Sequence, residues 1–345
     1  LITGGTGSFG KAFVKKIIES KNKVSRLVIF SRDELKQFEM SQNFPITKYP
    51  FIRFFIGDVR DEKRLLSASE GIETIVHAAA LKQVPTTEYN PFEAIKTNIM
   101  GANNVIEAAL KNKVKNVIAL STDKACSPIN LYGATKLCSD KLFISANNIK
   151  GSQKIKFSVV RYGNVFGSRG SVIPFFLKNR SKGELPITDK DMTRFNISLN
   201  DAVSIVMWSL KNLNGGELIV PKLPSYKIMD LAKAISLKCR TPIIGIRAGE
   251  KIHEEMMSSS DSQNTLELKN FYIILPSLNK KILSFYSKKF KAKKVKKGFV
   301  YNSNSNKNFL TIAKLKKLIL EFENNNKWKK KITRLLLKKL RTLEI

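Results

Sequence analysis

Six short apolar runs recur through the first half of the sequence, and helix-like segments fill the gaps between them. The runs span residues 1–3, 26–30, 51–56, 74–78, 116–121 and 156–161. Parallel neighbouring strands need a crossover connection, usually a helix, so this alternation predicts a parallel sheet covered on both faces by helices. The fold class that we expect is therefore α/β, with a doubly wound sheet.

The alternation ends after the sixth run, where loops rich in Gly, Pro and Ser begin, such as GNVFGSRGSVIPFF. Loops of this kind usually build a binding site rather than more sheet. We expect residues 1–163 to form the sheet domain, a helix and a strand around 197–222 to return to it, and 164–301 to form mainly a smaller C-terminal substrate-binding lobe. Residues 302–345 would be a polar linker, beginning with NSNSNKN, and a basic helical tail. The chain starts without methionine inside an expected strand, so we expect further residues before Leu1.

The sequence TGGTGSFG joins the first run to the first helix and places Gly4, Gly7 and Gly10 three residues apart. Glycines at such a turn let the backbone approach a pyrophosphate, whose charge meets the amides of the helix N-terminus. A glycine triplet alone is a weak signal, but a strand before it and a helix after it favour a Rossmann-type dinucleotide site over a structural turn. The predicted cofactor contacts at this turn and at later strand ends are Gly4, Thr6, Gly7, Ser8, Phe9, Gly10, Asp58, Val59, Ala78, Ala79 and Ala80.

The end of the second run, IFSRDELK, bears on the choice between NAD and NADP. An NAD site usually places a carboxylate about 20 residues after the glycines. This chain has Ser31 and Arg32 there, with Lys36 one helical turn later. A guanidinium group suits the 2′-phosphate of NADP, so we expect NADP, while Asp33 and Glu34 leave NAD open as the less favoured cofactor.

Tyr132 and Lys136, in YGATK, lie four residues apart and would share one face of a helix. A nearby ammonium group favours tyrosinate, so we expect the pKa of Tyr132 to lie below its usual value of about 10. Such a phenol can take the proton of a sugar hydroxyl while hydride leaves the same carbon for a nicotinamide. The alternative, an ordinary exposed tyrosine and lysine, is disfavoured by the glycine turn upstream.

The glycine turn, GDVRD and Y-x-x-x-K together resemble the extended short-chain dehydrogenases/reductases that act on nucleotide sugars. Within that family, STDKA with P-x-N-x-YGATK, SRDELKQ, RYGNVFGSRGSVIPFF and RAGEKIHEEM resemble the inverting UDP-N-acetylglucosamine 4,6-dehydratases that open pseudaminic acid biosynthesis. The likeness runs from Leu1 to about Leu320 and is strong through Met256. Beyond Tyr286, the lysine-rich segment departs from the family pattern.

This resemblance implies a role for each member of the cluster. Tyr132, helped by Lys136, would take the proton of the 4-hydroxyl; Lys124, made neutral with the help of nearby cations, would take the proton of carbon 5. Protonated Asp123 would donate to the departing 6-hydroxyl. A purely structural salt bridge between Asp123 and Lys124 is the alternative, although adjacent side chains usually point apart. The resemblance adds Thr122, Tyr132 and Lys136 as cofactor contacts and, for a UDP-sugar substrate, Lys82, Thr122, Asn164, Arg194, Arg247 and Glu250.

The residue after Asp123 separates this sequence from similar enzymes. Sugar 4,6-dehydratases that retain configuration resemble T-D-E at this point, and simple 4-epimerases carry small polar residues in place of the pair. Membrane-bound and capsule-pathway relatives keep T-D-K but resemble M-G-x-x-K. A UDP-N-acetylhexosamine 4-epimerase, a related dehydratase of capsule or O-antigen synthesis and a non-catalytic NADP sensor stay open, as do gluco- or galacto-configured substrates.

A net charge of +33 is typical of a nucleic-acid binder, but residues 280–345 hold 21 Lys or Arg and three Glu, a net +18. We therefore expect no nucleic acid partner, with binding by the tail as the alternative. The segment from Lys327 has helical spacing of its apolar residues, so it would pack on the protein or touch an acidic membrane or polyanion. The family resemblance implies a homo-oligomer, either a dimer or a hexamer.

The remaining composition predicts a soluble, cytoplasmic protein without a metal. No apolar run approaches the roughly 20 residues of a membrane span, and the first residues do not resemble a signal peptide. His77 and His253 are too few for a His-based metal site, and we expect both to be structural. The three cysteines lack metal-type spacing, so we expect buried, reduced thiols at Cys126, Cys138 and Cys239.

Overall fold

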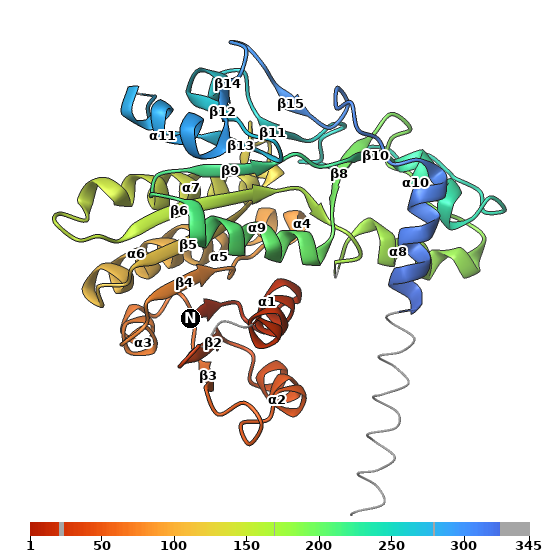
Figure 1. Ribbon diagram of the computed structural model, residues 1–345. Helices are drawn as coiled ribbons and strands as arrows, with labels where there is room; N and C mark the ends of the chain where they lie inside the picture. Colours follow the sequence, from red (N-terminus) through yellow and green to blue (C-terminus); the bar gives the residue numbers. More distant parts are fainter. Residues whose placement is uncertain (21–23, 169, 279, 325–345) are drawn as a thin grey trace, which may run out of the picture.

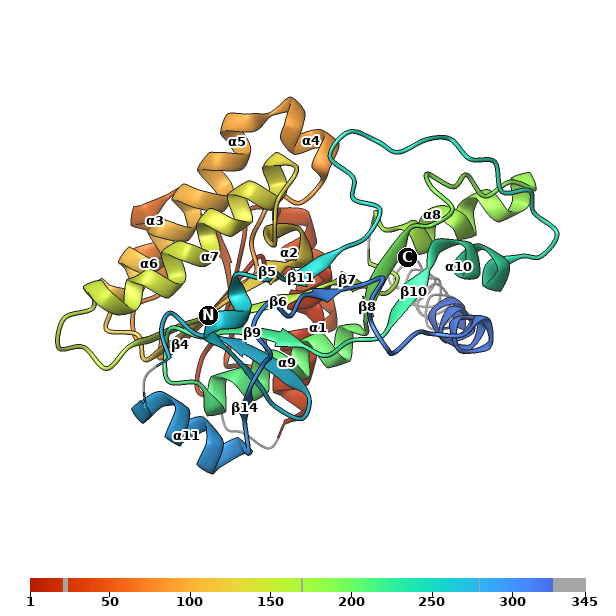
Figure 2. The same cartoon turned by 90° about the horizontal axis from the view of Figure 1, so that it is seen from above.

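The structure is a computed structural model and describes residues 1–20, 24–168, 170–278 and 280–324. The expected basic helix from Lys327 lies outside these residues. Two lobes are visible, a large lobe around an extended sheet and a smaller one around α8 and α10 (Figure 1). Between α10 and β11, the chain arches from the small lobe back toward α4 (Figure 2).

A ten-stranded sheet forms the centre of the large lobe, in the order β14-β12-β13-β9-β6-β5-β4-β1-β2-β3. Its first six strands are parallel and are β1 (Ile2–Thr3), β2 (Leu27–Ser31), β3 (Ile52–Ile56), β4 (Thr74–His77), β5 (Asn116–Thr122) and β6 (Lys156–Tyr162). Each begins and ends within one residue of an apolar run in the sequence. The doubly wound α/β fold is thereby confirmed.

Helices cover both faces of this sheet because some connections between parallel strands cross over one face and others cross over the opposite face. On one face, α3, α6 and α7 pack together, and on the other α1 packs against α9 (Figure 1). The helix α1 buries Gly10, Phe13 and Val14 on one face. The helical segments of the large lobe are α1 (Ser8–Glu19), α2 (Glu34–Asn43), α3 (Glu62–Ala68), α4 (Val84–Tyr89), α5 (Pro91–Ile95), η1 (Lys96–Met100), α6 (Gly101–Lys111), η2 (Asp123–Ala125), α7 (Leu131–Ile149), α9 (Leu199–Asn212), η4 (Asp261–Asn264) and α11 (Lys280–Phe290).

Four later strands extend the sheet beyond β6. They are β9 (Leu218–Pro221), which is parallel to β6, and the antiparallel strands β13 (Phe271–Ile274), β12 (Thr265–Glu267) and β14 (Lys293–Lys294). We expected residues 164–301 to form mainly the second lobe, but the part from β12 to β14 belongs to the large sheet. Leu266 and Ile273 are fully buried in the core of the large lobe, which holds this hairpin against β9.

The small lobe has a core of its own, which contains Phe176, Leu231 and Leu315. It is built from a three-stranded sheet, three short helical segments and a further helix over 312–324. The named elements are β7 (Asn164–Val165), α8 (Val172–Asn179), η3 (Arg180–Lys182), β8 (Thr193–Ile197), β10 (Ser225–Lys227) and α10 (Ile228–Ile235). A second small sheet pairs β11 (Glu255–Met257) with β15 (Tyr301–Asn302).

The polar segment 302–308 is packed, which corrects the linker expected from its composition. Ser303 is fully buried, and the side-chain amide of Asn306 donates to the Leu223 carbonyl at 2.7 Å and to Ser225 Oγ at 2.9 Å. Small polar side chains here satisfy backbone and hydroxyl groups at strand ends, which composition alone cannot distinguish from a solvated linker.

Several expectations from composition concern the surface and the thiols. Cys126 is buried, but Cys138 is exposed and Cys239 is half-buried, so burial of all three was wrong. Within the described part of the chain, no helix has the length and apolar character needed to cross a membrane, and no side-chain cluster could hold a metal ion.

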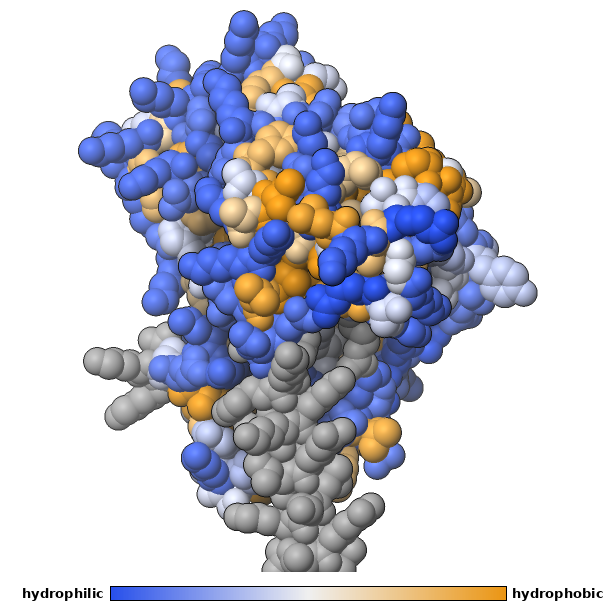
Figure 3. Space-filling model, turned by 90° about the vertical axis from the view of Figure 1, so that its right-hand side faces the viewer, coloured by the Kyte–Doolittle hydropathy of each residue, from blue (hydrophilic) through white to orange (hydrophobic). Residues whose placement is uncertain are grey.

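Apolar surface gathers on the side of the molecule that carries the small lobe, among mostly hydrophilic side chains (Figure 3).

Candidate active site

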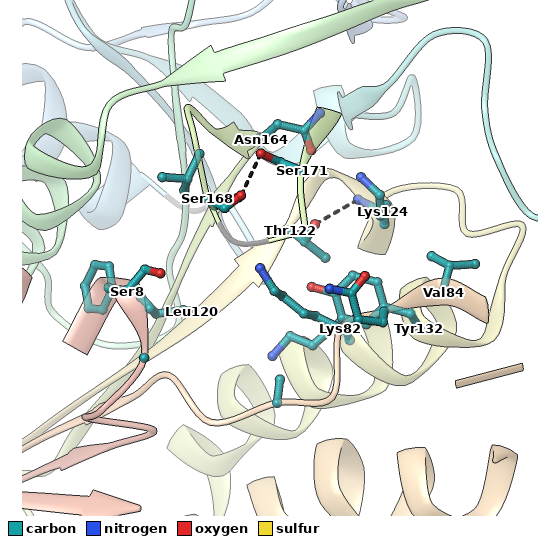
Figure 4. A pocket seen from close by; sticks show the side chains of 18 of the residues that line it. Ser8, Lys82, Val84, Leu120, Thr122, Lys124, Tyr132, Asn164, Ser168 and Ser171 are labelled. Atoms are coloured by element: carbon teal, nitrogen blue, oxygen red, sulfur yellow. Dashed lines mark hydrogen bonds between the residues drawn. The ribbon is translucent and has the colours of Figure 1, made fainter. Parts of the chain in front are cut away.

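A cavity of about 1100 Å³ lies where the two lobes meet, and residues from both lobes line it. The ends of β1, β2, β4, β5 and β6 open into it, as is usual for ligand sites of doubly wound sheets. Figure 4 shows Ser8, at the start of α1, on one side of the pocket and Lys82, Lys124 and Tyr132 on the other. The cavity therefore has two chemically different ends.

One end is the turn between β1 and α1, and its shape depends on glycine. Gly4 has φ +64°, and a Cβ there would lie 2.9 Å from the Cα of Ala79. A Cβ at Gly10 would overlap the carbonyl oxygen of Gly5. The amide of Gly7 donates to the Gly4 carbonyl at 2.9 Å, which closes the turn. This turn and the N-terminus of α1 fit a dinucleotide pyrophosphate.

The end of β2 carries the polar groups expected for an adenosine site. Ser31 Oγ is hydrogen-bonded to Thr6 Oγ1 at 2.7 Å. The side chain of Arg32 is 50% exposed, and its Nη1 lies 3.4 Å from Asp58 Oδ2. Lys36 forms an ion pair with Asp33, whose carboxylate also accepts from the Lys36 amide at 2.9 Å and so caps α2. Both cations border the cavity.

His77 lies behind the cavity wall at the end of β4. Its Nδ1 is 2.8 Å from Thr3 Oγ1, and Thr3 Oγ1 also accepts from the amides of Ala78 at 3.2 Å and Ala79 at 3.3 Å. Burial, with a smaller effect of Lys136, lowers the pKa of His77 to about 3. The ring is therefore neutral and fixes the strand end that carries Ala78, Ala79 and Ala80.

The helix α7 presents Tyr132 and Lys136 to the cavity, and both are largely buried. Asn130 caps this helix by accepting from the Gly133 amide at 2.7 Å. Burial raises the pKa of Tyr132 to about 12 and outweighs the attraction of Lys124, so the expected lowering was wrong. Burial also lowers the pKa of Lys136, against the attraction of Asp140.

The side chains of Asp123 and Lys124 meet at the end of β5. Lys124 Nζ lies 3.1 Å from Asp123 Oδ1 and 3.1 Å from Glu254 Oε1. The expectation that the adjacent side chains point apart was wrong, because the 3₁₀ turn η2 brings both toward one point. Burial alone would lower the pKa of Lys124, but the two carboxylates outweigh it and raise that pKa, contrary to our expectation.

The structure brings the predicted site residues together around one cavity, with the exception of Asp123. The cavity is lined by Lys124, Tyr132, Lys136 and by every predicted cofactor and substrate contact named above. Asp123 differs, because its carboxyl is fully buried behind Lys124. Burial raises the pKa of this carboxyl, which favours its protonated form.

A row of alternating charges leads from the cavity rim to Lys124. Arg247 Nε is 4.0 Å from Glu250 Oε2, Arg194 Nη2 is 3.5 Å from Glu250 Oε1, and Arg194 Nε is 3.6 Å from Glu254 Oε1. Arg194 is almost fully buried and also donates to the carbonyls of Thr193 and Ile252. An anion that entered the cavity would therefore meet guanidinium groups that are already linked to Lys124 through carboxylates.

The sequence did not single out two residues of this site. Glu254 lines the cavity and contacts Lys124. Tyr226 also lines the cavity and forms a hydrogen bond with Asn164. HEEM places two glutamates together, but nothing local tells which one faces inward. In the folded chain Glu254, whose backbone is hydrogen-bonded to Ser303, lines the cavity, while Glu255 contacts Cys126 and Ser127.

Comparisons with known proteins agree with this geometry. Residues 1–276 match the family model described as polysaccharide biosynthesis protein. The chain is 55% identical over 312 residues to the inverting UDP-N-acetylglucosamine 4,6-dehydratase of Campylobacter jejuni, covering 89% of this chain and 92% of that protein. It is 44% identical over 281 residues to the UDP-glucose 4-epimerase of Rickettsia canadensis, covering 79% and 82%. The solved structure of Pen from Bacillus thuringiensis superposes with a TM-score of 0.83 at 37% identity, covering 93% and 96%.

Proposed function

The chain belongs to the polysaccharide biosynthesis protein family, and on that premise we propose that it is a configuration-inverting UDP-N-acetylglucosamine 4,6-dehydratase, a hydro-lyase. Its product would be UDP-2-acetamido-2,6-dideoxy-β-L-arabino-hex-4-ulose, the first intermediate of pseudaminic acid biosynthesis for surface glycans or flagellin. The observation that carries this proposal is the contact of Lys124 with Asp123 in the cavity that also holds Tyr132 and Lys136. A base and an acid beside an oxidising site are what elimination of water requires.

The glycine turn fits a nicotinamide dinucleotide, and we propose NADP. Gly4, Gly7 and Gly10 would hold its pyrophosphate, and Arg32 and Lys36 its 2′-phosphate. When bound, the cofactor supplies a hydride acceptor for carbon 4 of the sugar and a hydride donor for carbon 6. The support for NADP over NAD is the pair of cations at the end of β2, where Asp33 binds Lys36 and Asp58 lies 3.4 Å from the half-exposed Arg32.

Tyr132, in its phenolate form, takes the proton of the 4-hydroxyl as that carbon is oxidised. The phenol lies in a hydrogen bond with Thr122, and the attraction of Lys124 opposes the effect of burial on its pKa. Lys136, one turn later on α7, lies in the same wall of the cavity. The resulting ketone acidifies the proton on carbon 5, which then needs a second base.

Lys124 and Asp123 provide the base and the acid through a single proton shift. The N–H of Lys124 already donates to Asp123 Oδ1, and moving that proton to the carboxylate gives a neutral amine and a carboxylic acid together. Lys124 then takes the proton of carbon 5, Asp123 protonates the leaving 6-hydroxyl, and water departs. The acid proton therefore arrives on Asp123 Oδ1, the oxygen that accepts the Lys124 N–H at 3.1 Å. A proton returned to carbon 5 from the opposite face inverts the configuration.

We propose that the UDP-sugar binds between the rim and this pair. Arg247, 60% exposed, and the deeper Arg194 suit the diphosphate, since guanidinium groups pair with phosphate oxygens. Glu250 would accept hydrogen bonds from the uridine ribose, while Lys82, Thr122 and Asn164 would contact the sugar. All six line the cavity.

The reaction is tested by incubating the protein with UDP-N-acetylglucosamine and NADP in deuterated water. We expect a product lighter than the substrate by one water, with deuterium at carbon 5 and L-arabino stereochemistry by NMR. The second candidate is a 4-epimerase, which the name of the Rickettsia relative favours. It predicts a product of unchanged mass inverted at carbon 4, and that product would overturn the proposed dehydratase.

A further inference from the structure

The amino group of Lys124 is held by two carboxylates that differ in origin. One belongs to the adjacent Asp123, and the other to Glu254, which is 130 residues later. The carboxylate side chains are 1% and 2% exposed, whereas the lysine side chain is 23% exposed. Lys124 thus reaches the cavity with both carboxylates beside it.

We propose that Glu254 is a positioning residue for Lys124: it orients the amine toward carbon 5 of the sugar and stabilises the ammonium that forms there. This inference rests on the proposed function, in which Lys124 is the base. Glu254 would act through Lys124 and exchange no proton with the substrate.

The orientation follows from the hydrogen bonds of the amine. An ammonium group has three N–H donors, and a neutral amine has two donors and one lone pair. Asp123 Oδ1 and Glu254 Oε1 accept two of the N–H groups, each at 3.1 Å. The third tetrahedral position, occupied by an N–H in the ammonium, is then left for the cavity. After the proton shift to Asp123, rotation about the Cε–Nζ bond places the lone pair there while Glu254 still accepts one N–H. With one acceptor alone, the amine could rotate and lose this direction.

The two carboxyl groups are in different electrostatic states, which separates their roles. Burial raises the pKa of Asp123, and the attraction of Lys124 does not overcome it. Burial also opposes ionisation of Glu254, but Lys124 and Arg194 together hold its pKa below the usual value. Asp123 is therefore the carboxyl that accepts a proton more readily, and Glu254 is the one that favours its ionised form beside Lys124.

The backbone at Glu254 is held rigidly by a segment remote in sequence. Its amide donates to Ser303 Oγ at 2.9 Å, and the Ser303 amide donates to its carbonyl at 2.8 Å. Ser303 Oγ also lies 2.7 Å from Thr193 Oγ1, beside Arg194. Two residues later, the Met256 carbonyl accepts from Arg161 at 3.1 Å. A carboxylate mounted in this way can fix its partner in one direction.

The test compares Glu254→Gln with Glu255→Gln in the full chain with cofactor and UDP-N-acetylglucosamine. The amide introduced by Glu254→Gln would keep the size and a hydrogen-bonding oxygen but lose the charge. We expect kcat to fall roughly 100-fold with little change in KM, within the range for a perturbed proton transfer. Reduced nicotinamide should accumulate, since oxidation at carbon 4 depends on Tyr132, while deuterium exchange at carbon 5 is lost. Glu255 contacts Cys126 and Ser127 instead, so its variant should keep wild-type kcat.

The pH profile of kcat separates a charge effect from a structural one. The negative charge of Glu254 raises the pKa of both Asp123 and Lys124. Its removal lowers both values, so the acidic and basic limbs should both move to lower pH in Glu254→Gln. Damage to the fold would lower the whole profile without moving its limbs. Glu254→Asp, which keeps the charge, should return the limbs toward the wild-type positions.

Three results would overturn the positioning role. Wild-type kcat and unmoved limbs in Glu254→Gln would remove Glu254 from the reaction. Lowered kcat with unmoved limbs would assign it a structural role. Elimination that survives in Asp123→Asn but not in Glu254→Gln would make Glu254 the acid. A wild-type protein that releases no water from the substrate would instead overturn the proposed function itself.

Discussion

The two ends of the cavity differ in how the chain assembles them. The glycine end, formed by the Gly4–Gly10 turn with Arg32 and Lys36, comes from consecutive residues and the next strand end, and its shape follows from backbone sterics. The charged cluster of Asp123, Lys124, Arg194 and Glu254 comes from three distant segments. The glycine end can be recognised from a short stretch of sequence, whereas the charged cluster is assembled only when the chain folds.

The difference extends to electrostatics. Arg32 at the glycine end is half exposed, so solvent screens its charge and its partners matter little. The charged cluster is largely buried, so each group sets the pKa of its neighbours. Substitutions at the glycine end should therefore change binding or folding, and those in the charged cluster should change chemistry. The following predictions test that division.

The largest effect is expected for Lys124→Ala. Loss of the base should lower kcat at least about 10³-fold, equivalent to roughly 4 kcal/mol in the barrier. Cofactor affinity, measured by fluorescence titration, should stay within about twofold because the glycine end is unchanged. Lys141→Ala, on the exposed side of α7, is the control and should behave as wild type. Full turnover by Lys124→Ala would remove the charged cluster from catalysis.

At the glycine end, Gly10→Ala should chiefly affect folding and cofactor binding. A Cβ would overlap the Gly5 backbone, so the turn must open, at a cost of about 3 kcal/mol of unfolding free energy. Denaturant unfolding with and without cofactor measures both effects. Gly151→Ala is a matched control, because its Cβ meets open space and only its φ of +56° costs about 1 kcal/mol. Equal losses in the two variants would contradict a sterically defined turn.

The same division explains what could be predicted from the sequence. The strands of the parallel sheet and the glycine turn were predictable because apolar runs and local spacing determine them. Asp123, Lys124, Tyr132 and Lys136 were recognised as a group, but their pKa values were not, since burial and Glu254 act through the tertiary fold. No local signal marks which glutamate of HEEM faces inward.

The C-terminal part shows the same limit. Short strands such as β12 and β14 have too few residues for a periodic pattern, so their place in the large sheet was missed. Ser303 lies in a sequence with the composition of a linker, yet it is buried because Thr193 and Glu254 supply partners for its polar groups. In both cases, the position of the segment in the fold depends on contacts with residues that are far away in the sequence.

A smaller effect, on cofactor choice, is expected for Arg32→Ala. Loss of a charged partner for the 2′-phosphate should raise the KM for NADP about tenfold and leave that for NAD nearly unchanged. The kcat should stay close to the wild-type value. This result would show that the glycine end affects cofactor binding without affecting the chemical steps. Arg53→Ala, on β3 with hydrogen bonds to the Pro50 and Ile52 carbonyls, serves as a surface control. Parallel rises in KM for both cofactors would argue against an NADP-selective role for Arg32.

The smallest expected effect comes from Ser303→Ala, which tests whether the charged cluster depends on residues outside the cavity. Ser303 Oγ accepts from the Glu254 amide, and its loss leaves that buried amide without its partner. One such hydrogen bond contributes about 1 kcal/mol, so kcat should fall about fivefold if the loss weakens the hold of Glu254 on Lys124. The pH limbs should stay in place because no charge is removed, and cofactor affinity should not change. Ser305→Ala, at an exposed position two residues later, should have wild-type kcat. If Ser303→Ala lowered only the unfolding free energy and left kcat unchanged, the charged cluster would be held from within the cavity alone.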